Sequence, residues 1–349
     1  MLIYWALFGF FAVGTLLTTF TAGRKPGWRP MLTVGAVITA LLIGLRYDVG
    51  ADWPNYQFMF AYARQASFER VLELGDPGYQ LLNWVVKRSD WQIWVVNLVC
   101  GAIFSWGLFR FCKAQADPWL AALIAVPYMV IVVAMGYTRQ AVALGILMAG
   151  LASVARGGST TRFALFTVGA ALFHKTAVVA FPLVALSSRR NRFLNLLIAL
   201  AASVLLYDLF LGDAMDQFVQ HYIKTGYSSQ GAAIRVVMNL VAALVFWVAG
   251  RRLQFNEVEW TLWRNFSLAA VGFLVLLFVL PSSTAVDRMS LYVMPLQIAV
   301  LARLPLMFRA QLPGKAAVMA YLAMVQFVWL NFAQHARYWV PYHFFPLWG

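Results

Sequence analysis

Long apolar runs, separated by short polar segments, recur along the whole chain. A membrane-spanning helix needs about 20 apolar residues. The pattern predicts such helices at 1–21, 31–45, 91–112, 118–136, 138–155, 193–212, 234–249, 262–281, 289–307 and 315–334. We see no internal repeat, and no polar stretch is long enough for a separate soluble domain. The sequence therefore predicts an all-α, polytopic membrane protein of about 10–12 membrane helices, in one transmembrane domain over residues 1–349.

The composition agrees with a membrane protein. The chain is 62% hydrophobic and 11% charged, whereas a soluble domain is about 25% charged. The net charge of +14 would suggest a nucleic-acid partner in a soluble protein. Here we expect no nucleic acid, because cytoplasmic loops of membrane proteins carry an excess of Lys and Arg. Cys100 and Cys112 fall on one predicted helix, ~18 Å apart, so no disulfide is expected.

Basic clusters orient the predicted helices. The segment GRKPGWR (23–29) is expected in the cytoplasm, so the N-terminus starts outside as a retained first span. The external parts are then a loop with short helices at about 46–90, smaller loops at 213–233 and 282–288, and the tail 335–349.

The segment 162–186 conflicts with this orientation, because basic clusters flank it on both sides. It carries His174 and Lys175 at its centre, and each half reaches only ~16 Å, about half a bilayer. We therefore expect a broken or re-entrant helix pair that turns at His174. The alternative is a plain span, with half of the topology inverted.

Several arginines lie on the predicted external side, where positive-inside bias predicts few. Arg46, Arg139, Arg235 and Arg288 fall at predicted helix ends. Arginine suits phosphate because its planar donors bind bidentately and stay charged. Helix N-termini near Arg139, Arg235 and Arg288 would add to the field. We interpret these four and Lys175 as pyrophosphate ligands; the alternative is that each arginine merely reaches the interface.

Two residues are candidate general bases. His174 lies in an apolar segment, where ionisable groups are costly and usually functional, and a histidine can activate a hydroxyl. It can equally be a phosphate ligand or a packed core residue. Asp52 in the first external loop competes as base. Gly50 and Pro54 predict an irregular loop around it.

The external acids have structural alternatives. Asp48 is expected to pair with Arg46, and Asp287 to cap a helix. No Asp-x-Asp pattern occurs in the sequence, so we expect no metal and no cofactor.

Aromatic residues are concentrated in the predicted external segments. An interfacial aromatic belt explains many of them, but the clusters 53–56 and 338–342 exceed what a belt requires. Aromatic faces beside Asp, Asn and Gln are a common way to hold sugars. The candidate sugar-binding residues are Asp48, Trp53, Tyr56, Tyr79, Gln140, Asp287, Tyr338 and Trp339.

Six short stretches occur in an order that resembles a known family. They are LRYDVGADWPNY (45–56), DPGYQLLNWV (76–85), YTRQAVALGI (137–146), ALFHKTAVVAFP (171–182), DRMSLYVMP (287–295) and NFAQHARYWVPY (331–342). The chain resembles the EpsG family of bacterial exopolysaccharide proteins, which are relatives of Wzy-type O-antigen polymerases. The resemblance implies the fold of multispan lipid-linked-sugar glycosyltransferases. It does not identify the base.

The resemblance implies a polymerase that joins undecaprenyl-pyrophosphate-linked oligosaccharide repeat units. Donor and acceptor would meet at the outer face of the bacterial inner membrane, and the expected partners are the bilayer, a chain-length regulator and a flippase. Fixed cations would stabilise the leaving pyrophosphate without a metal, and one in-line displacement would invert the anomeric configuration.

Three other functions are weighed against a polymerase. An O-antigen ligase would use the same donor, but the loop 213–233 is short for a ligase. A flippase would carry charge at several depths and often internal repeats, neither of which the sequence shows. A structural or assembly subunit would leave the external arginines unexplained.

Overall fold

The computed structural model describes residues 1–20, 28–187, 231–280 and 283–348, together with positions 197, 200 and 204. The predicted span 193–212, apart from those three positions, and most of the loop 213–233 lie outside the described residues. The same is true of most of the basic segments 23–29 and 187–192.

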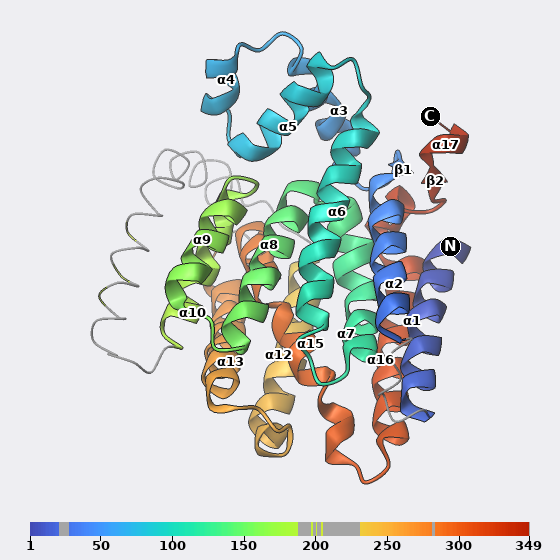
Figure 1. Cartoon of the computed structure of the whole chain (residues 1–349), viewed down its shortest axis with the longest axis vertical. Coiled ribbons are helices and arrows are strands. Elements are labelled where there is room, and N and C mark those ends of the chain that lie inside the picture. The colour runs from blue at the N-terminus through green and yellow to red at the C-terminus, as the bar shows by residue number, and fades with distance from the viewer. Residues whose placement is uncertain are drawn as a thin grey trace.

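Five described helices are long and apolar enough to cross a membrane. They are α6 (Ile93–Cys112), α8 (Thr138–Ala155), α12 (Ala232–Ala249, extended to Arg252 by the 3-10 turn η4), α13 (Glu257–Val279) and α16 (Gln311–Phe332). Shorter apolar helices run beside them (Figure 1). Among these are α1 (Leu2–Phe20), α2 (Trp28–Gly44) and α7 (Pro118–Ala125), which continues into the π-helical segment η1 (Val126–Ala134). The prediction of an all-α polytopic membrane protein is confirmed.

Helix α8 lies at the centre of this bundle. In its apolar window 89% of residues are buried inside the protein, against 28% in α16. Every residue of η1, which leads into α8, is buried as well. The start of α8 is therefore anchored by a buried segment, which suits a position that carries site residues.

The expected hairpin is present. Helix α9 (Thr160–Ala171) ends before His174, and the chain resumes as the 3-10 segment η2 (Lys175–Val179) and helix α10 (Ala180–Ala185). Because α9 contacts both η2 and α10, the chain reverses direction at His174. The prediction of a break at His174 is confirmed, and a straight helix through this segment is excluded.

The predicted span 289–307 is not continuous. It consists of α14 (Ser283–Ser290), the 3-10 turn η5 (Leu291–Val293), α15 (Pro295–Leu301) and the 3-10 turn η6 (Leu304–Met307), with a bend of 43°. Pro295 has no N–H to continue a helix. The side chain of Asn239 donates to the carbonyl of Ser290 at 2.9 Å, which supports the bend. Arg288 therefore lies in the last turn of α14, and the prediction that a helix begins there is wrong.

The segments between α2 and α6 and after α16 gather at one end of the bundle, which we call the α3–α5 end (Figure 1). It contains α3 (Trp53–Tyr62), α4 (Phe68–Glu73) and α5 (Pro77–Arg88). Strand β1 (Arg46–Tyr47) pairs antiparallel with β2 (His343–Phe344), which is flanked by η7 (Gln334–Tyr338) and α17 (Phe345–Trp348). The loop before α3 is irregular, as predicted, with positive φ at Asp48 and Gly50.

Candidate functional site

Asp76 joins three segments that are far apart in the sequence. It precedes the first residue of α5 and has a left-handed backbone with φ 59°. Its carboxylate lies 2.6 Å from the guanidinium of Arg139 at the start of α8. The second carboxylate oxygen accepts the backbone N–H of Lys175 at 3.2 Å. The backbone N–H of Gly78 also donates to the carbonyl of Leu172 at 2.8 Å, so the start of α5 closes over the tip of the hairpin.

Asp76 was not among the site residues predicted from the sequence. The signal that indicates it is the run Asp-Pro-Gly at 76–78 in a predicted external loop. Proline is favoured in the first turn of a helix, with a capping residue before it. The pattern locates a helix start, but only the structure shows that Arg139 and Lys175 meet it.

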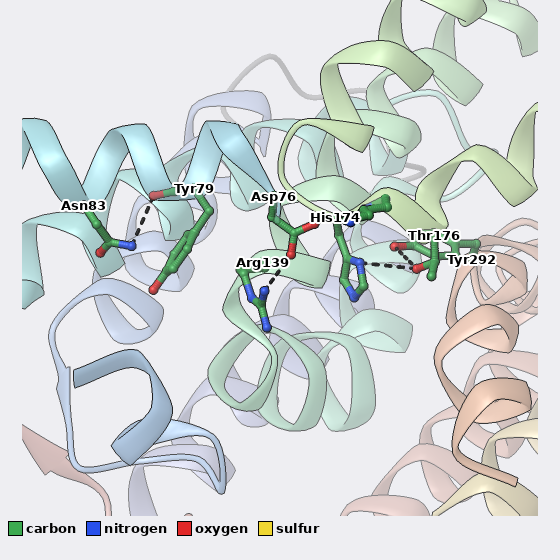
Figure 2. Close-up of polar contacts among 8 residues, drawn as sticks. Asp76, Tyr79, Asn83, Arg139, His174, Thr176 and Tyr292 are labelled. Atoms are coloured by element: carbon green, nitrogen blue, oxygen red, sulfur yellow. Dashed lines mark hydrogen bonds and ion pairs between the residues drawn. The ribbon is translucent and has the colours of Figure 1, made fainter. Parts of the chain in front are cut away.

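The hairpin tip carries a chain of polar side chains. The Nδ1 of His174 lies 3.4 Å from the hydroxyl of Thr176, which lies 3.2 Å from the hydroxyl of Tyr292 in η5 (Figure 2). His174 also interacts electrostatically with Asp76, Arg139, Arg288 and Lys175. Thr176 and Tyr292 were missed by sequence reasoning, because neither residue type stands out in an apolar segment.

The ammonium of Lys175 has no acidic partner within ion-pair distance among the described residues. The side chain is half-buried and lies beside Gly75, where an added Cβ would be 3.7 Å from the ammonium nitrogen. The nearby carboxylate of Asp76 is held by Arg139 instead. A half-buried cation without a counter-charge is suited to an anionic ligand.

Asp52 lies directly before α3 and faces two of the predicted arginines. It is half-buried, and burial raises the pKa of its carboxyl above the usual value, while Arg288 and Arg139 act in the opposite direction. The amide of Gln140 donates to the carbonyl of Arg288, which ties α8 to α14. The structure thus brings Asp52, Arg139, Gln140, His174, Lys175 and Arg288 together, from four separate parts of the chain.

Arg235 is enclosed by protein partners. Its guanidinium lies 2.8 Å from the carboxylate of Asp287 and donates to the hydroxyls of Tyr128 at 2.6 Å and Tyr137 at 3.3 Å. Both charged residues are buried. Each charge is thus already compensated inside the fold. The roles of Arg235 as a pyrophosphate ligand and of Asp287 as a sugar ligand stay predictions.

Arg46 lies behind the site rather than in it. It is fully buried and donates to the hydroxyl of Thr138 at 2.6 Å and to the carbonyl of Ile43. No carboxylate of the described residues lies within ion-pair distance of it. In particular, the expected pair with Asp48 does not form, and Asp48 is exposed on its irregular loop. Arg46 thus supports the start of α8, and its role as a pyrophosphate ligand stays a prediction.

Most aromatic rings of the predicted sugar-binding set are buried. The rings of Trp53, Tyr56, Tyr79 and Trp339 are at most 3% exposed, so none of them presents an open face. Tyr338 is exposed. Trp339 lies in the hydrophobic core, and the sugar-binding role of these residues stays a prediction. The sequence placed these residues in external segments, but it did not show which of them the tail and α5 would cover.

Within the described ranges, no group of three or more His, Cys, Asp or Glu side chains is arranged to hold a metal ion. Cys100 and Cys112 are buried and unpaired. The independence from metals expected from the sequence stays a prediction, which a chelator experiment tests.

Comparison with known proteins identifies a family match. The model of the EpsG family matches residues 31–344. No curated protein and no solved structure matches the chain.

Proposed function

Since the chain belongs to the EpsG family, a Wzy-like polymerase family, we propose that it joins undecaprenyl-pyrophosphate-linked oligosaccharide repeat units into a polysaccharide. The reaction would be a metal-independent glycosyl transfer with inversion at the anomeric carbon. In this proposal the protein lies in the bacterial inner membrane, and its α3–α5 end faces outward.

One observation carries the proposal: two candidate bases and three cations converge at the α3–α5 end. The bases are Asp52 and His174, and the cations are Arg139, Lys175 and Arg288. When the bond between the anomeric carbon and the pyrophosphate breaks, negative charge accumulates on the leaving oxygens. Cations already fixed in place stabilise that charge without reorganisation.

The cations have different roles in this proposal. Lys175 has no described acidic partner and would bind the pyrophosphate directly. Arg288 interacts with Asp52 and His174, so it would lie between the phosphate and the base. Arg139 is oriented by Asp76 at 2.6 Å, and a carboxylate that holds a guanidinium in one geometry reduces the ordering needed on ligand binding.

The base would take the proton of the acceptor hydroxyl as its oxygen attacks the anomeric carbon. The attack comes from the face opposite the pyrophosphate, which departs with the electrons of the broken bond. Asp52 and His174 are both near the cations, and both remain candidates for the base. The Nδ1 of His174 lies 3.4 Å from the hydroxyl of Thr176. In the tautomer in which Nδ1–H donates to that hydroxyl, the lone pair of Nε2 would be available to take the proton of the acceptor.

The test uses purified protein in a lipid nanodisc, supplied with the lipid-linked repeat unit. We expect a ladder of products that each differ by one repeat, and the ladder should persist in excess chelator. Lys175→Met should weaken donor binding and turnover together. Lys87→Met, the same substitution on α5, is the matched control and should behave like the wild type.

Two results would contradict the proposal. Transfer of a single unit to a different acceptor would indicate a ligase. Movement of the lipid-linked oligosaccharide across liposomes, without any ladder, would indicate a flippase.

A further inference from the structure

Residues 334–348, which we call the C-terminal strap, bind along the segment that leads to Asp52. Strand β2 of the strap pairs with β1, and the N–H of Phe345 donates to the carbonyl of Leu45 at 2.7 Å. The hydroxyl of Tyr342 donates to the carbonyl of Leu42 at 2.8 Å. Closest to the site, the N–H of Gly50 donates to the carbonyl of Tyr338 at 2.8 Å. The strap thus follows the backbone from the end of α2 almost to Asp52.

Trp339 anchors the strap in the core. Its indole is 1% exposed and donates to the carbonyl of Ile131 in η1 at 2.7 Å. Its own carbonyl accepts the hydroxyl of Tyr4 at 2.6 Å, and its ring contacts Trp329 edge-on at 5.0 Å. A buried indole with its N–H satisfied is held in a single orientation.

Two glycines allow three backbones to meet at Trp339. A Cβ on Gly136 would lie 2.4 Å from the Trp339 ring, so only glycine fits under the indole. A Cβ on Gly50 would lie 2.5 Å from the carbonyl of Met135. Gly50 also has φ 104°, which favours glycine. The loop before α3, the entry to α8 and the strap are therefore packed backbone against backbone.

Both glycines of this junction are close in sequence to a residue of the site. Gly50 is two residues before Asp52, and Gly136 is three residues before Arg139. Asp52 and Arg139 interact with one another, yet they belong to different elements, and Trp339 is the side chain packed where those elements meet. We infer that Trp339 is a positioning residue, which fixes the loop carrying Asp52 relative to the start of α8.

The expected change in kcat rests on the proposed function, whereas the expected change in hydrogen exchange does not. Trp339→Phe removes the indole N–H and keeps an aromatic ring in place. We expect kcat to fall roughly 10-fold with the donor KM within about two-fold, because small misplacements of reacting groups are costly. Hydrogen exchange should become faster at the amides of residues 46–50 and remain unchanged in α6. The matched control is Trp348→Phe, on an indole that is 61% exposed in the same strap; it should match the wild type in both measurements.

A wild-type kcat together with wild-type exchange at residues 46–50 in Trp339→Phe would overturn the inference. So would faster exchange throughout the helices with an unchanged kcat per folded molecule, since that result describes a general packing role. The exchange measurement needs no substrate. If the wild-type protein made no polymer, the proposed function would fail, while exchange at residues 46–50 would still decide the role of Trp339.

Discussion

At the scale of single residues, charge compensation separates the site from its surroundings. Arg235 is saturated by Asp287 and two tyrosines, whereas Lys175 has no acidic partner in the described part of the chain. Both were predicted as phosphate ligands, Arg235 from its place at an external helix end and Lys175 from its place beside His174 in an apolar segment. Sequence position could not distinguish them, because the distinction depends on which carboxylate each cation meets after folding. The sequence predicted Asp52, Arg139, His174, Lys175 and Arg288 among a larger set that also held Arg46 and Arg235. It could not predict which members of that set would lie together.

The identity of the base can be decided by comparing Asp52→Asn with His174→Ala. Loss of the base should lower turnover by roughly 10²–10⁴-fold and leave donor binding nearly intact. The other variant should weaken donor binding along with the rate, because it lies beside the cations without taking the proton. Turnover measured in a product-ladder assay and donor affinity measured by calorimetry give the two quantities separately. Wild-type turnover in both variants would remove the proposed site.

If Asp52 is the base, the pH dependence of turnover should report its environment. Burial raises the pKa of this carboxyl above the ordinary value of about 3.9. A base acts when deprotonated, so kcat should fall as the pH drops through this raised pKa, at a higher pH than an exposed aspartate would give. Arg288 lowers the pKa of Asp52, so Arg288→Ala should move this acid limb to still higher pH, whatever it does to the maximal rate. If the acid limb of the kcat profile stays at the same pH in Arg288→Ala, a group other than Asp52 titrates there.

At the scale of elements, the sequence predicted the runs of apolar helix and the break at His174. It missed the bend in 283–307 and the π-helical segment η1. The hairpin was accessible because two basic clusters conflict with a single crossing. The bend could not be predicted, because Pro295 is compatible with the start of a helix as well as with a break. The contacts that decide it, such as that of Asn239 with Ser290, join residues remote in sequence.

Asp76→Asn tests the joint between α5, α8 and the hairpin. Asparagine keeps a carbonyl oxygen for the N–H of Lys175 but loses the charge that faces Arg139. We expect a loss of unfolding free energy of about 1–3 kcal/mol and a lower turnover, because Arg139 is no longer oriented. The readouts are thermal unfolding and the ladder assay.

The matched control for Asp76→Asn is Glu73→Gln, which alters the exposed ion pair with Arg70 at 2.8 Å. Exposed pairs contribute little to stability, so this variant should unfold at the wild-type temperature. Equal effects of the two substitutions would show that Asp76 is an ordinary surface partner.

At the scale of the whole molecule, polar groups are buried at both ends of the bundle. At the end where α6 finishes, Arg303 pairs with Glu259 at 2.6 Å, and Lys315 pairs with Asp117. Each of these cations is compensated by an acidic partner, as is usual for structural ion pairs. At the α3–α5 end Arg139 is paired with Asp76, but Lys175 has no acidic partner among the residues that the structure describes. This difference between the two ends favours a reaction at one face over transport through the protein. The sequence indicated the difference only as an excess of external arginines.

The orientation of the bundle can be measured by cysteine labelling, because both native cysteines are buried. Gln57 in α3 and Arg309 after η6 are exposed at opposite ends. In intact cells a membrane-impermeant maleimide should label Gln57→Cys and should label Arg309→Cys only after the membrane is opened. The reverse pattern would place the α3–α5 end in the cytoplasm and would contradict the proposed outward-facing reaction.

The position of the strap in the chain has a consequence for biosynthesis. Residues 334–348 leave the ribosome after every helix that contributes to the site, and contacts between residues so distant in sequence form late. A nascent chain halted before residue 334 carries Asp52, Arg139 and His174 but lacks Trp339, which packs between the loop before α3 and the entry to α8. Such a chain would lack the contacts that hold the loop before Asp52 against the start of α8. These contacts would therefore form only after the strap has left the ribosome.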